Sequence, residues 1–102
     1  MNLTSKQRAY LRGIASVENA IFQVGKGGLN DNLIAQLDDA LRARELIKIK
    51  VLDNSLLEVR STAEEMAERT GADLVEVRGS TAVLFRRNPQ NVQIEFPKAK
   101  KK

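Results

Sequence analysis

Glu45-Leu46-Ile47-Lys48-Ile49-Lys50-Val51, at residues 45–51, alternates apolar and charged side chains. Successive side chains of a β-strand point to opposite faces of its sheet. One face of this segment therefore takes the branched apolar residues, and the other takes Lys48 and Lys50 together with Leu46. The pattern predicts a strand with one buried face.

Two more elements are predicted on the amino-terminal side of this strand. Leucines at every fourth position (33, 37 and 41) indicate a helix that Asn30 or Asp31 caps and that ends near Arg44. Before that helix, the apolar run at residues 20–24 stops at a group of glycines. A short apolar run with such an end favours a buried strand.

Capping residues mark a helix at the start of the chain and another after the central strand. Thr4 or Ser5 can cap a first helix, whose apolar residues fall at helical spacing. Ser61-x-x-Glu64 and Thr62-x-x-Glu65 are overlapping capping boxes. They predict that a third helix starts there, and Gly71 is expected to end it.

The remaining segments predict a turn and a hairpin. Asp53-Asn54-Ser55 has the composition of a turn, and the apolar runs at residues 74–77 and 82–85 are joined through Gly79-Ser80 like the strands of a hairpin. Strands that alternate with helices favour a mixed sheet covered by helices. We predict a compact two-layer α/β domain in the order helix-strand-helix-strand-helix-strand-strand, with a four-stranded mixed sheet.

The composition excludes most catalytic and metal-binding chemistry. The 102 residues suffice for one domain and include no histidine, cysteine or tryptophan. A Cys/His zinc site, a disulfide, a thiol nucleophile and an imidazole acid–base pair are therefore ruled out. The sequence shows neither a targeting signal nor a membrane-length apolar stretch. We expect a cytoplasmic, monomeric protein that is not an enzyme and has no cofactor or metal.

The net charge of +4 is unevenly distributed. Residues 1–30 carry +3, residues 31–76 carry −5 and residues 77–102 carry +6. Basic ends around an acidic middle would suit nucleic acid or another anionic surface if the fold brought those ends together.

The carboxyl-terminal part of the chain has a weaker pattern. We expect a domain at residues 1–87 and a basic, partly flexible extension at residues 88–102, with a mobile tail of lysines at its end. Val92, Ile94 and Phe96 alternate with polar residues. That alternation is compatible with an added edge strand, a partner-binding segment or a plain surface extension.

Gly25-Lys26-Gly27-Gly28 is a G-x-x-G sequence between a predicted strand and a predicted helix. Without a Cβ, glycine lets the backbone approach a phosphate, the start of the following helix offers amides to an anion, and Lys26 adds a cation. KH domains clamp a nucleic-acid backbone with such a loop, but a tight strand-to-helix turn needs the same glycines. The P-loop is excluded because its Lys-Ser/Thr pair is absent.

Other cations become informative only if they gather beside this turn. They are Lys6, Arg8 and Arg12 in the first helix, Lys48 and Lys50 in the central strand, and Arg78, Arg86 and Arg87 around the hairpin. Taken singly, each is typical of a solvated surface. Phe22 and Phe85 lie in apolar strands and are expected in the core, so recognition of a nucleic-acid backbone is favoured over base stacking.

Four segments, in this order, resemble the CRM domain in its stand-alone bacterial, YhbY-like form. They are Leu3-Thr4-Ser5-Lys6-Gln7-Arg8 with Leu11-Arg12, Gln23-Val24-Gly25-Lys26-x-Gly28-Leu29, Glu45-Leu46-Ile47-Lys48-Ile49-Lys50, and Gly79 with Val83-Leu84-Phe85-Arg86. The resemblance covers residues 3–86.

The resemblance implies an RNA-binding module with a fold similar to the C-terminal domain of translation initiation factor three. Bacterial members associate with precursors of the large ribosomal subunit, so ribosomal RNA is the implied partner, with ribosomal proteins as further candidates. The positions that match the family's motifs are Gly25, Lys26 and Gly28 in the loop, with Gly27 in its variable position, and Arg8, Arg12 and Arg86 in the flanking segments.

Two other functions stay open at this point. A protein-interaction module could dock a ribosomal protein or an assembly factor through the acidic middle or through residues 92–96. DNA binding is supported only by the net charge. For RNA binding, the candidate residues are Gly25, Lys26, Gly27, Gly28, Arg8, Arg12, Lys6, Lys48, Lys50 and Arg86.

Overall fold

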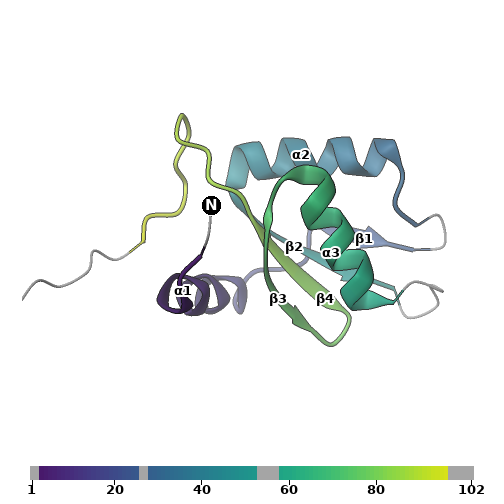
Figure 1. Cartoon of the computed structure of the whole chain (residues 1–102), viewed down its shortest axis with the longest axis horizontal. Helices are drawn as coiled ribbons and strands as arrows, with labels where there is room; N and C mark the ends of the chain where they lie inside the picture. Colours follow the sequence, from purple (N-terminus) through teal and green to yellow (C-terminus); the bar gives the residue numbers. More distant parts are fainter. Residues whose placement is uncertain (1–2, 26–27, 53–57, 97–102) are drawn as a thin grey trace, which may run out of the picture.

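In the residues that the computed structural model describes, 3–25, 28–52 and 58–96, three helices and four strands follow one another in the predicted order (Figure 1). They are α1 (Ser5–Ala15), β1 (Phe22–Val24), α2 (Asp31–Arg44), β2 (Leu46–Val51), α3 (Val59–Thr70), β3 (Asp73–Arg78) and β4 (Thr81–Phe85). The strands form one sheet in the order β1-β2-β4-β3. β1 runs parallel to β2, and the other neighbours are antiparallel, so the predicted mixed α/β sheet is confirmed.

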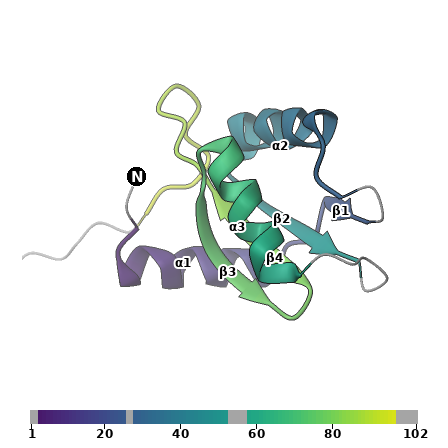
Figure 2. The ribbon, with the colours of Figure 1, turned by 45° about the vertical axis from the view of Figure 1, so that its right-hand side comes forward.

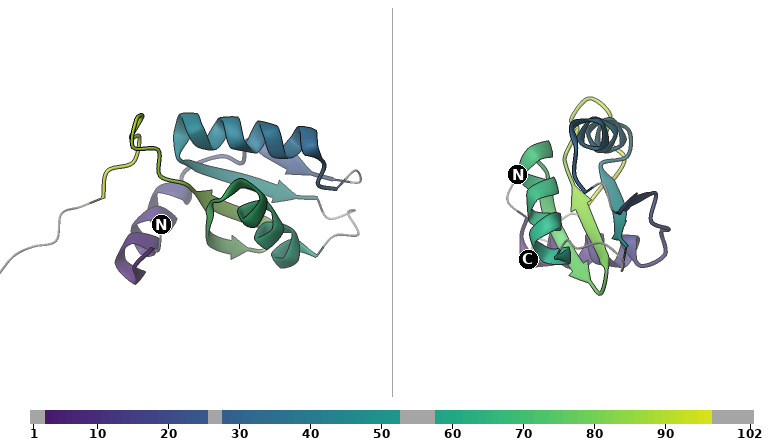
Figure 3. Two further views of the ribbon diagram at one scale, coloured as in Figure 1. Left: turned by 45° about the horizontal axis from the view of Figure 1, so that its top comes forward. Right: turned by 90° about the vertical axis from the view of Figure 1, so that its right-hand side faces the viewer.

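Helices cover both faces of the sheet, so the domain has three layers and not the predicted two, and each face has its own apolar cluster. α2 and α3 lie side by side over one face (Figure 3), where Ile47, Ile49 and Val51 are buried among Leu37, Leu41 and Met66. On the other face, Leu11 and Ala15 of α1 pack on Val75, Val83 and Phe85. The alternation in residues 46–51 thus has the predicted result, because the isoleucines face α2 and α3 while Lys48 and Lys50 lie on the face of α1.

The predicted caps are confirmed for the first two helices but not for α3. Thr4 and Gln7 form a capping box, and the Asn30 side chain accepts a hydrogen bond at the start of α2. α3 begins at Val59 instead, so the capping boxes predicted at residues 61–65 are wrong. Thr62 lies inside α3 and is buried with the residues that face the core. It therefore has a helical backbone, whereas a capping residue needs an extended one. The predicted turn at residues 53–55 lies outside the described residues.

The described residues after β4 form no strand, but they are fastened to the domain. Ile94 and Phe96 pack on the cluster beneath α1, and the Phe96 ring contacts Tyr10 and Phe85. Figure 1 shows this segment, in yellow, beside the start of α1. An added edge strand is therefore not formed at residues 92–96; Ile94 and Phe96 pack within the molecule, whereas Val92 is exposed.

The carboxylate of Glu45 anchors this segment. Glu45 follows α2, is fully buried and has a φ of 67°, a conformation that side chains other than glycine adopt rarely. Its oxygens accept hydrogen bonds of 2.6–3.0 Å from the Arg87 guanidinium and from the backbone N–H groups of Asn88, Gln93 and Ile94. One carboxylate therefore fixes both ends of the loop at residues 87–94.

Acid is expected to weaken this anchor. Burial raises the pKa of Glu45, but the N–H groups of Asn88, Ile94 and Gln93 and the Arg87 charge lower it more, so the result lies below the ordinary 4.5. A lowered pKa in the folded state stabilises the protein at pH values above the unfolded pKa, and this stability is lost as the pH falls through the folded value. Urea unfolding from about pH 7 to about pH 3 should show a shallower acid decline for Glu45→Gln than for the unchanged protein. Identical declines would contradict the assignment.

Candidate nucleic-acid interface

The two described ends of the G-x-x-G turn differ in their need for glycine. Gly28 has a φ of 65°, and its N–H donates to the Gly25 carbonyl at 2.8 Å. A Cβ on Gly25 would lie 3.0 Å from Cδ1 of Leu52, which follows β2. Lys26 and Gly27 lie outside the described residues. The backbone conformation therefore requires glycine at position 28, whereas Gly25 only lies close to the Leu52 side chain, and the turn lies directly against the end of β2.

A row of polar side chains crosses the sheet beside this turn. The strand pairings place Gln23 opposite Lys50, Lys50 opposite Thr81, and Thr81 opposite Arg78. All four belong to the face of the sheet on which α1 lies, and Gln23, Lys50 and Arg78 are exposed. Since neighbouring strands lie about 4.8 Å apart, the backbones of Lys50 and Arg78 are separated by roughly 10 Å. We call these four residues the polar row.

A hollow of about 120 Å³ adjoins the polar row, between the end of α1 and the β3–β4 hairpin. Its lining residues are Ala15, Ser16, Lys48, Glu76, Arg78, Thr81 and Val83. The Lys48 ammonium donates at 3.1 Å to the carbonyls of Ala15 and Glu18, so it also holds the end of α1. Nε of Arg12 lies 3.8 Å from the Glu76 carboxylate.

The fold therefore gathers cations from three distant parts of the sequence. Arg12 comes from α1, Lys48 and Lys50 come from β2, and Arg78 comes from β3. These cations come together because β1, β2 and the β3–β4 hairpin all reach the same end of the sheet (Figure 2). A backbone hydrogen bond joins the end of β2 to the hairpin turn, since the N–H of Val51 donates to the Ser80 carbonyl at 2.7 Å.

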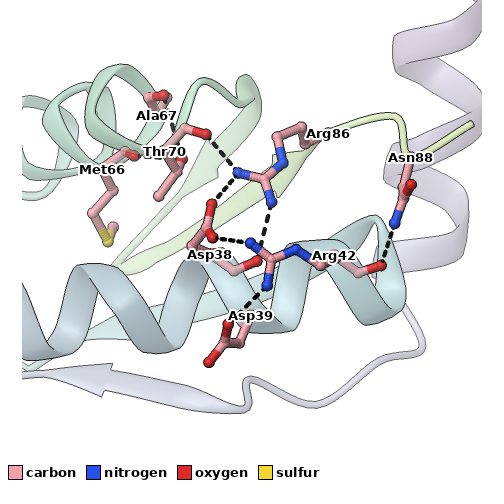
Figure 4. A network of polar contacts seen from close by, with 8 residues as sticks. All are labelled: Asp38, Asp39, Arg42, Met66, Ala67, Thr70, Arg86 and Asn88. Carbon is pink, nitrogen blue, oxygen red and sulfur yellow. Dashed lines mark hydrogen bonds and ion pairs between the residues drawn. The ribbon is translucent and has the colours of Figure 1, made fainter. Parts of the chain in front are cut away.

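Arg86 lies at the opposite end of the sheet. It follows Phe85, which pairs with the first residue of β2, whereas the turn follows Val24, which pairs with the last. These ends are roughly 17 Å apart at about 3.3 Å per residue. The Arg86 guanidinium donates to the Asp38 carboxylate and to the carbonyls of Asp38 and Thr70 (Figure 4). The hydrogen bond from Arg86 lowers the pKa of Asp38 below its ordinary value, although partial burial opposes it.

Two other candidates of the first helix also lie apart from the turn. The Arg8 guanidinium donates to the carbonyls of Leu74 and Val75, at an irregularity in the pairing of β3 with β4. Lys6 is exposed in the first turn of α1, and Figure 2 shows that this end of α1 lies far from the turn after β1. Arg8 thus joins α1 to β3, and Lys6 is remote from the polar row.

Some residues of this surface were not singled out from the sequence. Gln23 belongs to a motif segment but was not a candidate, and Thr81 and Glu76 carry no motif; the register of the strands brings these three beside the lysines. Ser16 reaches the hollow from the end of α1. The position of Arg78 opposite Thr81 could have been found, because it follows from a two-residue hairpin turn at Gly79-Ser80.

Two kinds of site are not found in the described ranges. Among residues 3–25, 28–52 and 58–96, no cluster of three or more acidic, histidine or cysteine side chains is placed to hold a metal ion. Within the same residues, none of the helices has the length and apolar character needed to cross a membrane.

Comparison with known proteins identifies the domain. Residues 3–86 match the model of the CRS1 / YhbY (CRM) domain. The chain belongs to this family. The match includes the turn after β1, the polar row and the hollow, and it ends at Arg86, before the segment that Glu45 anchors.

Two relatives and one solved structure are similar to this CRM domain protein over nearly their whole length. The Bacillus subtilis protein named "Probable RNA-binding protein YqeI" is 46% identical over 95 residues, which cover 93% of this chain and 99% of the relative. A Haemophilus influenzae protein named "RNA-binding protein" is 29% identical over 96 residues, 94% of this chain and 96% of the relative. The solution structure of SAV1595 from Staphylococcus aureus matches with a TM-score of 0.78 and 47% identity, over 94% of this chain and all of that one.

Proposed function

We propose that this CRM domain protein binds structured RNA by its sugar–phosphate backbone at the turn of residues 25–28, the polar row and the hollow. The names of its relatives support RNA as the ligand class. The observation that carries the proposal is that β-sheet register places Lys50 and Arg78 in one exposed row beside the turn. The described residues that line the hollow include no aromatic side chain, which favours backbone contacts over base stacking.

Arg8 and Arg86 have another role in this proposal. Their guanidinium groups are engaged with backbone carbonyls and a carboxylate of the same chain, so they maintain the fold that presents the surface. Lys26, which the motif match assigns to the loop, is proposed as a phosphate contact together with Lys50.

The RNA is proposed to be ribosomal RNA in precursors of the large subunit. The support is the likeness to bacterial members of the family, which associate with such precursors. In that role the protein acts in the cytoplasm during ribosome assembly, as a binding protein without catalytic activity. Sedimentation with precursor subunits before and after RNase treatment tests this assignment. Loss of the association after RNase supports it, and an association that survives would instead favour docking on a ribosomal protein.

Charge reversal at the proposed phosphate-binding lysines is expected to weaken binding. Lys26→Glu and Lys50→Glu should each lower the affinity for a structured RNA about tenfold at low salt, because each removes a cation that binds phosphate and adds a repelling charge. The slope of log affinity against log salt should also become shallower by about one in each variant, because one phosphate fewer is neutralised. Fluorescence anisotropy at several salt concentrations measures both quantities.

Arg60→Glu is the matched control for these variants. It changes the net charge equally, but Arg60 lies on α3, which packs on the other face of the sheet. Its affinity should fall much less than that of the two lysine variants. Equal losses of affinity in all three would show that only net charge matters and would overturn the proposed surface.

A further inference from the structure

Among the described residues, Glu76 is the one carboxylate that lines the hollow. It comes from β3, opposite Val83, and 19% of its side chain is exposed. Arg12 and Arg78 flank it, each with a nitrogen 3.8 Å from Oε1. This distance is too long for a hydrogen bond. Within the described part of the chain, the Glu76 oxygens thus have cations on two sides but accept no hydrogen bond.

A carboxylate is an unexpected group in a surface for nucleic-acid backbones. Phosphate and ribose ring oxygens only accept hydrogen bonds, and an ionised carboxylate also only accepts them. Phosphates close to Glu76 are therefore repelled by it. The one hydrogen-bond donor that the RNA backbone carries is the ribose 2′-hydroxyl, and DNA lacks this group.

We propose that Glu76 accepts a hydrogen bond from a ribose 2′-hydroxyl and thereby selects RNA against DNA. This inference rests on the proposed function, because it places the RNA backbone over the hollow. Arg12 and Arg78 attract phosphates of either polymer, and Glu76 repels both. Only RNA compensates that repulsion, since its hydroxyl donates to the carboxylate. Glu76 is thus a specificity-determining residue of the surface.

Three probes of identical sequence separate the hydroxyl from the shape of the helix. They are an RNA hairpin, the same hairpin with 2′-fluoro sugars, and a DNA hairpin. The 2′-fluoro sugar keeps the RNA-like pucker but cannot donate a hydrogen bond. The affinity of each probe is measured by fluorescence anisotropy for the unchanged protein and for Glu76→Leu and Glu76→Gln. Glu64→Leu, on α3, removes the same charge outside the hollow and is the control.

The unchanged protein should bind RNA roughly tenfold more tightly than the 2′-fluoro hairpin, as expected for a hydrogen bond to a charged acceptor. Glu76→Leu should bring this ratio close to one, mainly because the 2′-fluoro and DNA hairpins bind more tightly. Glu76→Gln retains a neutral acceptor and should give an intermediate ratio. Glu64→Leu should leave the ratio unchanged. Circular dichroism checks the fold, and if Glu76→Leu does not fold, Glu76→Gln and the unchanged protein decide the question.

Two results would overturn the inference. One is equal affinity of the unchanged protein for the RNA and 2′-fluoro hairpins. The other is an equal change in both affinities on replacing Glu76, which would mean that Glu76 only positions Arg12 and Arg78. Either result leaves the proposed function standing, whereas failure of the unchanged protein to bind any RNA hairpin at low salt would refute the proposed function itself.

Discussion

Glu45→Ala is expected to lower the free energy of unfolding by about 3–5 kcal/mol, the range for removing one partner of a buried ion pair. The carboxylate is fully buried and accepts hydrogen bonds from Arg87 and from three backbone N–H groups. Without it, these donors lose their acceptor beneath the loop. The segment that places Ile94 and Phe96 on the cluster under α1 should then detach before the sheet unfolds.

Urea unfolding measures the destabilisation, and Tyr10 reports the detachment. The chain has one tyrosine and no tryptophan, so its intrinsic emission comes from Tyr10, whose ring centroid lies 5.8 Å from that of Phe96. Glu95→Ala is the control, because it removes an exposed carboxylate of the same segment. Its stability should change by less than about 0.5 kcal/mol. A destabilisation by Glu45→Ala no larger than that of this control would contradict the anchoring role.

Arg86→Ala is expected to cost about 3 kcal/mol of stability, since the Arg86 side chain connects α2 to the end of α3 by hydrogen bonds. Its guanidinium binds the Asp38 carboxylate together with the carbonyls of Asp38 and Thr70 (Figure 4). Removing it leaves a half-buried carboxylate and two carbonyls without this donor. Arg86→Lys should recover only part of the stability, because an ammonium lacks the planar fork that reaches all three oxygens.

Arg42→Ala tests whether the stability of the fold depends on the number of ion pairs that Asp38 forms or on how deeply they are buried. Arg42 binds the same Asp38, but 60% of its side chain is exposed, against 22% for Arg86. Replacing Arg42 should cost less than about 1 kcal/mol of stability.

The RNA affinity of Arg86→Lys tests whether Arg86 contacts the ligand. Under conditions where Arg86→Lys is folded, its RNA affinity should equal that of the unchanged protein. A variant that is fully stable but binds RNA weakly would instead make Arg86 a direct contact.

Local patterns predicted those elements whose signals lie within a few residues. The alternation at residues 46–51, the leucine repeat of α2, the glycine turn at residues 79–80 and the cap at Asn30 each depend on neighbouring side chains, and each was confirmed. The start of α3 was predicted wrongly, because the capping pattern at residues 61–65 competes with the burial of Thr62 and Ala63. Packing against the sheet determines the helix start more strongly than the capping sequence does.

Sequence spacing could not predict the contacts that hold residues 87–96 on the domain. Glu45 looked like the first residue of a strand, yet it caps α2 with a positive φ and anchors residues 87–94. Nothing near it in the chain marks that role, since its partners lie 42–49 positions away. The apolar alternation at residues 92–96 is visible in the sequence, but the sequence does not show that Ile94 and Phe96 pack on the apolar cluster beneath α1.

The amino-acid sequence by itself determined the order of the elements, the two faces of β2 and the absence of histidine and cysteine chemistry, because these depend on local pattern and composition. It also identified the cations, but not which of them act together. The tertiary structure decided that Arg12, Lys48, Lys50 and Arg78 share one surface with Glu76, whereas Arg8 and Arg86 are engaged inside the fold. The physical reason is that strand register and helix packing set distances between residues far apart in the chain, and these distances determine which charged side chains share a surface and which are engaged inside the fold.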